Sequence, residues 1–185
     1  MAIWNWKNKT LTVSDEGLSL VGPHLDANQG SQDQRIKGIA MKIRMAREAD
    51  FAQWLPLWQG YQTFYKTAIK EEVTAKTWSR FLDQNEPMHC ALLEIDGNLV
   101  GMVHYIFHRS CWTEGDYVYL QDLFVDPELR GKGLGRALIE HVYDAAEKAK
   151  ASRVWWLTHE SNTQAMHLYD RIADKSGFIQ YRKLM

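Results

Sequence analysis

Two periodicities in the hydrophobic positions divide this chain into predicted strands and helices. Apolar residues at every second position predict strands at 41–46, 89–95, 99–108, 117–125, 153–158 and 177–185. Apolar residues that recur every three or four positions predict helices at 50–65, 72–82, 134–149 and from 161 onward. The order β-αα-βββ-α-β-α-β predicts an α/β fold with a mixed, mostly antiparallel central sheet flanked by helices.

Three local signals refine these helices. Pro56 lies inside the first helical pattern and should kink the helix or delay its start, because proline lacks an N–H and clashes with the preceding turn. Ser161 and Gln164 have the spacing of a capping box, which predicts that the last helix begins there. In the helix before it, the predicted apolar face consists of Leu134, Leu138, His141, Ala145 and Ala149.

Residues 1–40 differ in pattern from the rest of the chain. Residues 11–22 alternate around a turn at 15–17 like a small hairpin, and residues 22–38 are polar and loop-like. Met41 opens the first strand with a clean alternation. We therefore divide the chain into an N-terminal extension, 1–40, and one domain, 41–185. The extension is either a native hairpin with a loop or a segment added to the native chain.

The stretch 122–138 carries the main chemical signal. An apolar strand runs into Asp126-Pro127, and Arg130-Gly-Lys-Gly-Leu-Gly-Arg136 follows at the start of a helical pattern. Glycine at a helix start costs backbone entropy, so three glycines indicate that something approaches the backbone closely. Backbone N–H groups at a helix N-terminus, with the helix dipole behind them, form a cradle for an anion, and the three cations add charged donors.

Two common phosphate-binding loops do not fit this stretch. A P-loop requires G-x-x-x-x-G-K-[ST], a string that the chain does not contain. A dinucleotide-binding G-x-G-x-x-G would need glycine where the chain has Arg136 or Leu138. It would also need a βαβ unit, whereas this loop follows an antiparallel-looking meander.

Composition narrows the function mainly by exclusion. The chain has 185 residues, of which 45% are hydrophobic, and a formal net charge of −1, so we expect no nucleic-acid or anionic-membrane partner. The longest uncharged run, 51–65, is too short and too polar to span a bilayer. The first residues lack the basic-then-apolar form of a signal peptide, and we expect a cytoplasmic protein.

Cysteine and histidine suggest no metal site. Cys90 and Cys111 offer neither a disulfide framework nor a metal-type pair. His104 and His108 share one strand face by parity, but a metal would need a third ligand that the sequence does not supply. We expect no metal, and structural or site-lining roles for the histidines.

The segment RGKGLG at 130–135 matches the [Q/R]-x-x-G-x-[G/A] signature of GCN5-related N-acetyltransferases, the GNAT superfamily. The resemblance extends from Met41 to the end of the chain in the family's element order, and it implies a GNAT-like fold with acetyl-CoA as co-substrate. Within the family, the chain resembles the polyamine- and amino-acid-type acetyltransferases of small molecules. The residues similar to the family's later N-x-x-A-x-x-x-Y…G-F segment are Asn162, Ala165, Tyr169 and Gly177-Phe178.

The resemblance implies a role for each matching residue. The backbones of Leu123, Phe124 and Val125 would bind the pantetheine arm of acetyl-CoA as an added strand, and Asn162 would contact the same arm. Tyr169 falls on the tyrosine that protonates the leaving thiolate, a role that suits a phenol, which is protonated at neutral pH. The residues implied to hold the pyrophosphate are Arg130, Gly131, Lys132, Gly133, Leu134, Gly135 and Arg136.

The sequence leaves two candidates for the base that takes the proton of the amine. Several polyamine-type relatives have Glu-Asp where this chain has Gln121-Asp122, and glutamine cannot accept a proton. Asp122 could be the base, directly or through water. Neighbouring strand residues face opposite sides, however, so Asp122 would point away if Gln121 faced the substrate. Ordered water is then the alternative.

The acceptor is expected to enter between the first two helices and the strand meander. Aromatic rings with a carboxylate suit a cationic amine. The candidate contacts are Tyr61, Tyr65, Trp112, Glu114 and Gln121, and each of the first four could equally be a packing or surface residue.

We interpret the sequence as an N-acetyltransferase that moves acetyl from acetyl-CoA to a primary amine of a small molecule by direct attack in a ternary complex. Both cysteines lie outside the motif, which argues against a covalent acetyl-cysteine route. Two alternatives stay open: a protein lysine or N-terminal acetyltransferase, and a non-catalytic acyl-CoA-binding module. We further expect a homodimer.

Overall fold

The computed structural model describes residues 2–5, 10–13, 34–36 and 39–185, with side chains from Met41 onward. The chain forms two compact units, Met1–Gly30 and Ser31–Met185. In the first unit, β1 (Ala2–Asn5) pairs antiparallel with β2 (Thr10–Val13). The hairpin turn predicted at 15–17 lies outside the described residues.

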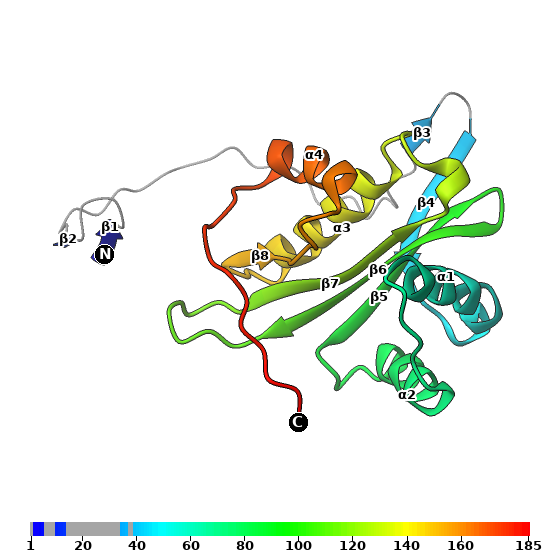
Figure 1. The fold of residues 1–185 in the computed structure, drawn as a ribbon, viewed down its shortest axis with the longest axis horizontal. Coiled ribbons are helices and arrows are strands. Elements are labelled where there is room, and N and C mark those ends of the chain that lie inside the picture. The colour runs from blue at the N-terminus through cyan, green and yellow to red at the C-terminus, as the bar shows by residue number, and fades with distance from the viewer. Residues whose placement is uncertain (1, 6–9, 14–33, 37–38) are drawn as a thin grey trace. The chain divides into compact units, whose positions relative to one another are not determined.

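The described part of the second unit is built on a six-stranded sheet in the order β3-β4-β5-β6-β7-β8 (Figure 1). Neighbouring strands pair antiparallel, except that β7 and β8 are parallel. The predicted fold class, with a mixed and mostly antiparallel sheet, is therefore confirmed. The strands are β3 (Gln34–Ile36), β4 (Ile39–Met45), β5 (Met88–Ile95), β6 (Asn98–His108), β7 (Tyr117–Val125) and β8 (Arg153–Trp155).

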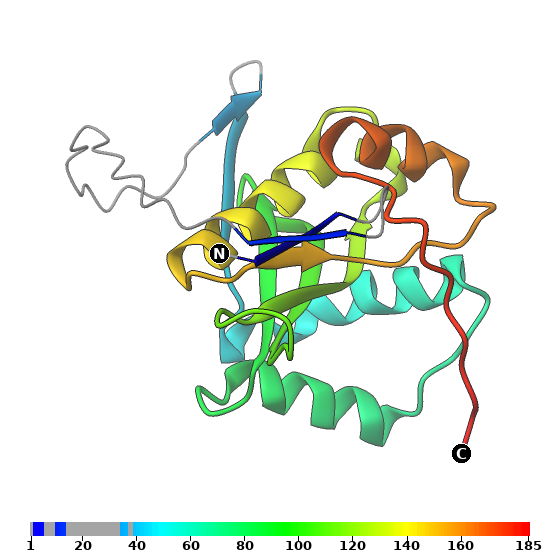
Figure 2. The same ribbon diagram turned by 90° about the vertical axis from the view of Figure 1, so that its left-hand side faces the viewer.

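Helices cover both faces of this sheet. Figures 1 and 2 show α1 and α2 on one face and α3 and α4 on the other. Within the described residues, no helix is long and apolar enough to cross a membrane. The helices are α1 (Phe51–Phe64), α2 (Glu71–Leu82), α3 (Leu134–Lys148) and α4 (Thr163–Ile172), with 3-10 turns at Glu48–Asp50 and Pro127–Leu129.

Two strand predictions at the C-terminal end of the chain are wrong. β8 stops at Trp155 and does not continue to 158. Residues 177–185 form no strand, and their side chains Phe178, Ile179 and Tyr181 are exposed. A strand needs the unpaired edge of another strand, and local alternation does not reveal whether such an edge exists.

Helix boundaries differ from the predictions in smaller ways. Pro56 lies within α1 and does not delay its start. The N-cap of α4 is Asn162, because the Ser161 hydroxyl is hydrogen-bonded to His159 Nδ1 instead of capping the helix. The stripe that α3 buries contains more apolar area than the predicted face, and it consists of Leu134, Leu138, Ile139, Val142 and Ala146.

The unit that contains the sheet begins at Ser31, before the expected boundary at Met41. The reason is β3, which pairs with the start of β4 and so belongs to the same sheet. The motif residues all lie after Met41, in the part of the chain that the sequence assigned to the domain.

Each face of the sheet has its own hydrophobic core. On the α3 face, aliphatic side chains such as Leu138 and Val142 pack against Val103 and Val118. On the α1–α2 face the core is aromatic, and its fully buried centre is Trp54. The aromatic core also contains Trp58, Trp78, Phe81 and Phe124. The strands between the two cores therefore present apolar residues on both sides.

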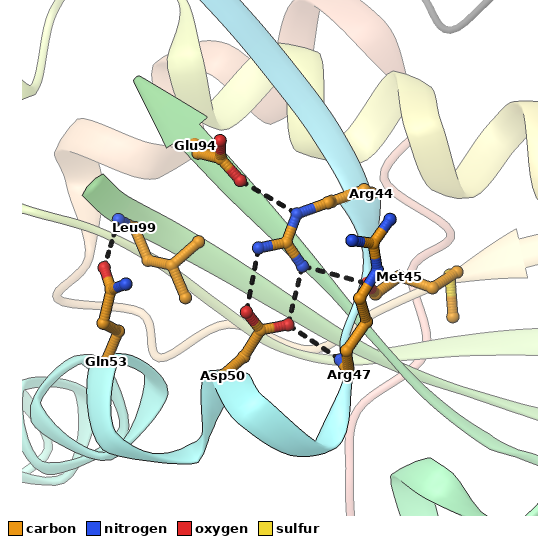
Figure 3. Close-up of polar contacts among 7 residues, drawn as sticks. All are labelled: Arg44, Met45, Arg47, Asp50, Gln53, Glu94 and Leu99. Atoms are coloured by element: carbon orange, nitrogen blue, oxygen red, sulfur yellow. Dashed lines mark hydrogen bonds and ion pairs between the residues drawn. The ribbon is translucent and has the colours of Figure 1, made fainter. Parts of the chain in front are cut away.

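A buried ionic network fixes the start of α1 to two strands (Figure 3). The Arg44 guanidinium on β4 donates two hydrogen bonds to the Asp50 carboxylate, at 2.6 and 2.8 Å, and a third to Glu94 Oε2 on β5 at 2.9 Å. Asp50 also accepts from the Arg47 backbone N–H at 2.8 Å. Gln53 Oε1 accepts from the Leu99 backbone N–H at 3.1 Å and thereby ties α1 to β6.

Because of this network, we predict that Asp50 contributes to the free energy of unfolding. The hydrogen bonds from Arg44 hold the pKa of Asp50 below its ordinary value, against the opposing effect of burial. Asp50→Asn should therefore lower the free energy of unfolding by about 3 kcal/mol at pH 7, the scale for removing one partner of a buried ion pair. A lowered pKa in the folded state stabilises above the ordinary value and loses this effect as pH falls through the lowered pKa. The difference between wild type and variant should shrink below about pH 4.

Urea denaturation at pH 7, 5 and 3 measures this difference. Asp96→Asn is the matched control, because Asp96 is an exposed aspartate in the β5–β6 turn and its substitution should change stability by less than about 0.5 kcal/mol. Equal effects of the two substitutions at pH 7 would contradict the assigned role of Asp50.

Candidate active site

A cavity of about 530 Å³ lies where the end of β7, the end of α1, the glycine loop and α4 meet. The structure brings most of the predicted site residues to its walls. Those that line it are Tyr61, Tyr65, Gln121, Leu123, Phe124, Val125, Arg130, Gly131, Gly133, Leu134, Gly135, Arg136, Asn162 and Tyr169. The glycine loop and the last helix, far apart in sequence, thus form one site.

The glycine loop has the geometry of an anion cradle. Gly131 and Gly133 have φ of +76° and +84°, in the left-handed region that glycine adopts without strain. A Cβ built on either residue meets no atom within 4 Å, so the space above the loop is open to a ligand. Gly133 is the N-cap of α3 and offers no side chain to the unpaired N–H groups of the first turn. These residues fit a bound pyrophosphate.

The loop cations have different positions. Arg130 lies against the rings of Phe64 and Phe124, and its Nε donates to the Val125 carbonyl at 3.3 Å. Arg136 forms an exposed ion pair with Glu140 at 2.7 Å, one turn further along α3. Lys132 is exposed and does not line the cavity, so the prediction that it surrounds the anion is not supported by its position. Arg171 on α4 also lines the cavity, although no sequence motif indicates a role for this residue.

The parallel strands β7 and β8 separate beside this cavity. They pair only from Tyr117 to Tyr119 on β7. Beyond that point the edge of β7 that faced β8 has no partner strand in the described part of the chain. Leu123, Phe124 and Val125 line the cavity there, together with Trp156, which follows β8. An extended ligand can add to this edge as a strand does. The splay that the resemblance implied is therefore present.

Tyr169 reaches the cavity from α4. Its ring packs edge-on against Trp156, with 5.3 Å between ring centroids. Burial, with a smaller contribution from Tyr65, raises the pKa of Tyr169 to about 12, so its phenol is protonated at any physiological pH. Across the cavity, the Asn162 side chain interacts with the Tyr65 hydroxyl, which links the N-terminus of α4 to the end of α1.

A β-bulge in β7 decides where Asp122 points. His104 of β6 lies opposite Asp122, while the next residue, Tyr105, lies opposite Leu120, so Gln121 is the extra residue in β7. The bulge reverses the alternation, and Asp122 faces the aromatic core with His104. The expectation that Asp122 points away from a substrate-facing Gln121 is therefore wrong, because it assumed a regular strand.

The second cavity, of about 160 Å³, lies on the same face as Asp122. It is bounded by α1, α2, β5, β6 and β7, and both Asp122 and Gln121 line it. Gln121 also lines the larger cavity, so this bulged residue marks the boundary of the two. The apolar walls include Trp58, Ile69 and Phe81.

Asp122 is buried and tightly held. The Asp122 Oδ2 atom lies 3.0 Å from His104 Nδ1, and Trp54 Nε1 donates to His104 Nε2 at 3.1 Å. Burial, followed by the charge of Asp122 and a hydrogen bond to it, raises the pKa of Tyr61 well above its ordinary value. Asp122 thus lies near both the Tyr61 hydroxyl and the His104 ring, at the wall of the second cavity.

Two predicted acceptor contacts do not reach either cavity. Trp112 and Glu114 lie in the loop between β6 and β7, at 109–116, where both are exposed. Residues that the sequence argument missed occupy their place: Trp58 and Phe81 line the second cavity, and His104 binds Asp122. The sequence predicts only that His104 and His108 share one strand face. It does not reveal that Asp122 is the partner of His104, because the register of β6 and β7 depends on the bulge.

No metal site accompanies these cavities in the described residues, where no group of three or more His, Cys, Asp or Glu side chains lies together. Burial, with smaller effects of the Asp50 and Asp122 charges, raises the pKa of the Cys90 thiol, which is therefore neutral. Cys90 lies on β5 in the aromatic core, and Cys111 is exposed in the β6–β7 loop.

Comparisons with known proteins identify the family. The Acetyltransferase (GNAT) family profile matches residues 51–173. A D-amino-acid N-acetyltransferase of Saccharomyces cerevisiae is 34% identical over 143 residues, which cover 76% of this chain and 89% of the relative. A thialysine N-epsilon-acetyltransferase of Mus musculus is 28% identical over 155 residues, with coverage of 76% and 91%.

A solved structure supports the same fold. A ribosomal-protein-alanine N-acetyltransferase from Brucella melitensis biovar Abortus 2308 superposes with a TM-score of 0.67 at 22% identity, over 79% of this chain and 99% of that chain. The protein described here belongs to the GNAT family and is an acetyltransferase. Members of this family use acetyl-CoA as co-substrate.

The cradle geometry predicts the effect of a charge at position 133. Gly133→Asp places a carboxylate where the first-turn N–H groups of α3 meet the anion. The affinity for acetyl-CoA should fall by about 10²-fold, or about 3 kcal/mol, through lost charged hydrogen bonds and added repulsion. Isothermal titration calorimetry measures the change.

Gly97→Asp is the matched control. Gly97 has φ +79° in the β5–β6 turn, so the substitution imposes the same left-handed strain away from the cavity. It should leave the affinity unchanged. Equal affinity of Gly133→Asp and wild type would contradict the assignment of the glycine loop as the pyrophosphate-binding site.

Proposed function

We propose that this enzyme transfers acetyl from acetyl-CoA to a primary amine of a small molecule by direct attack in a ternary complex. The observation that carries the proposal is the junction of the two cavities at Gln121. Asp122 lines one cavity and Tyr169 the other, and Gln121 lines both, so one cavity offers a proton acceptor and the adjoining cavity a proton donor. A transfer that takes a proton from an amine and develops charge on a sulfur needs such a pair.

The chain's own residues account for the binding of the donor. The first-turn amides of α3 and the left-handed glycines would hold its pyrophosphate, and the free edge of β7 would bind the pantetheine arm. Arg130, fixed against two rings, supplies a positive charge beside that edge. When bound, acetyl-CoA supplies an activated acetyl thioester.

Tyr169 serves as the hydrogen-bond donor to the leaving sulfur in this proposal. A phenol with a pKa of about 12 is a weaker acid than a thiol, which has an ordinary pKa near 8.5. It therefore acts as a hydrogen-bond donor to the charge that develops on the leaving sulfur and keeps its own proton, and the departing thiolate takes its proton from solvent.

Asp122 serves as the base. A carboxylate at the wall of the acceptor cavity attracts a cationic amine and can take its proton before attack. The neutral Cys90 thiol, buried on β5, is not available as a nucleophile, which supports direct attack by the amine over a covalent route.

The second cavity favours a particular class of acceptor. Among the described residues that line it, none is lysine or arginine, and most are apolar or aromatic. We infer an acceptor whose amine lies at Asp122 and whose uncharged, apolar stem or side chain fills the cavity. The relatives named for D-amino acids and thialysine act on amines of small size, which supports a small molecule over a protein.

A panel of acceptors tests this function by release of free thiol. Phenylethylamine, putrescine, D-phenylalanine and a lysine-containing peptide should separate the possibilities. We expect turnover of the small amines, with preference for apolar stems. Acetylation of the peptide alone would indicate a protein acetyltransferase, and acetyl-CoA binding with no turnover of any amine would indicate a binding module.

Tyr169→Phe tests the hydrogen bond from Tyr169. The ring and its packing against Trp156 remain, so acetyl-CoA should bind almost normally, while kcat should fall on the order of 10²-fold. Tyr181→Phe, which removes an exposed hydroxyl from the C-terminal segment, is the control and should have no effect. Wild-type turnover by Tyr169→Phe would return this tyrosine to a packing role.

A further inference from the structure

We propose that His104 is a positioning residue, held by Trp54 in one tautomer, that aims the Asp122 carboxylate at the acceptor cavity. The inference rests on the proposed function, in which Asp122 takes the proton of the amine. It concerns a buried chain of three side chains, Trp54–His104–Asp122, that runs from the first turn of α1 through β6 to the bulge in β7.

The indole of Trp54 decides which nitrogen of His104 carries the proton. Indole Nε1 is a donor only, so the His104 Nε2 atom 3.1 Å away must accept. The proton of the neutral ring therefore lies on Nδ1, and this N–H donates to Asp122 Oδ2 at 3.0 Å. Trp54 thus disfavours the tautomer with the proton on Nε2.

Packing prevents the ring from leaving this arrangement. Trp54 is fully buried and the His104 side chain is 3% exposed. The ring centroid of Phe81 lies 4.5 Å from that of His104, and the centroid of Trp58 lies 5.2 Å from it. Rotation of the imidazole would break both hydrogen bonds without access to water, which is costly for buried polar groups.

The consequence for Asp122 is a fixed orientation. His104 binds one carboxylate oxygen, Oδ2, which leaves Oδ1 for the acceptor. A base must lie within hydrogen-bond distance of the proton that it takes, and a displacement of about 1 Å can cost about 10²-fold in rate. His104 also lines the second cavity, but its two ring nitrogens are occupied by Trp54 and Asp122, so its hydrogen bonds act on the reaction through this carboxylate.

Two amide substitutions separate the two hydrogen bonds of the ring. In His104→Asn the amide nitrogen takes the place of Nδ1 and can still donate to Asp122, while Trp54 loses its acceptor. In His104→Gln the amide oxygen takes the place of Nε2 and can still accept from Trp54, while Asp122 loses its donor. Each variant keeps one half of the network, so each serves as the control for the other.

We expect kcat for the best amine to fall on the order of 10²-fold in His104→Gln and by less than about tenfold in His104→Asn. KM for acetyl-CoA should stay at the wild-type value in both, because the ring does not line the larger cavity. Thermal denaturation reports the folded fraction of each variant. Equal losses of kcat that follow the folded fraction would overturn the proposal and leave His104 a structural residue.

The tautomer has a readout that does not depend on turnover. In ¹⁵N NMR of the full-length wild-type protein, the His104 signals, identified by their disappearance in His104→Asn, should show a protonated Nδ1 and an unprotonated Nε2. Trp54→Phe keeps an aromatic ring and removes the N–H, so the two ¹⁵N shifts should move toward each other. A protonated Nε2 in wild type, or unchanged shifts in Trp54→Phe, would overturn the assignment, whereas failure of every amine would overturn only the proposed function.

Discussion

The site depends on one extra residue in one strand. Gln121 interrupts the pairing of β7 with β6. Each later residue of β7 therefore faces the side of the sheet opposite to the one it would face in a regular strand. Without this bulge Asp122 would face the aliphatic core under α3, where an unpaired carboxylate costs several kcal/mol. With the bulge, Asp122 lies opposite His104 at the aromatic core and lines the second cavity. A local change of backbone register thereby determines which chemistry is available.

The phase change is visible in the sequence once its meaning is known. In YVYLQDLFV the residues directed to the aliphatic core are Val118, Leu120, Leu123 and Val125, two alternations separated by Gln121-Asp122. A regular strand cannot place Leu120 and Leu123 on one face. Apolar residues at both ends of the segment are enough to predict a strand, but they do not show that its two halves alternate on different faces.

Local patterns predicted most of the fold and the donor half of the site. Helix and strand periods depend on a few neighbouring residues and located α3 and β7 correctly. The loop glycines Gly131, Gly133 and Gly135 and the tyrosine assigned by resemblance, Tyr169, all line the larger cavity. The acceptor half depends on residues that meet only after folding. Trp58 and Asp122, which are 64 positions apart, line the second cavity together, and His104 binds Asp122 across 18 positions. Trp112 lies in a loop whose course no short pattern fixes. The segment 177–185 shows the same limit, because alternation does not supply a partner edge.

The splay between β7 and β8 would make the stability of the folded chain depend on the concentration of its acetyl donor. β8 is joined to the sheet over three residue pairs, and the next part of the β7 edge has no neighbour in the described chain. A donor that pairs with this edge would complete the sheet and add contacts between β7 and α4. Binding to the folded state alone raises stability by about 1.4 kcal/mol for each tenfold excess of ligand over its Kd. The amount of folded enzyme in a cell would then follow the supply of its acetyl donor, so that scarcity of the donor lowers both the rate and the lifetime of the catalyst.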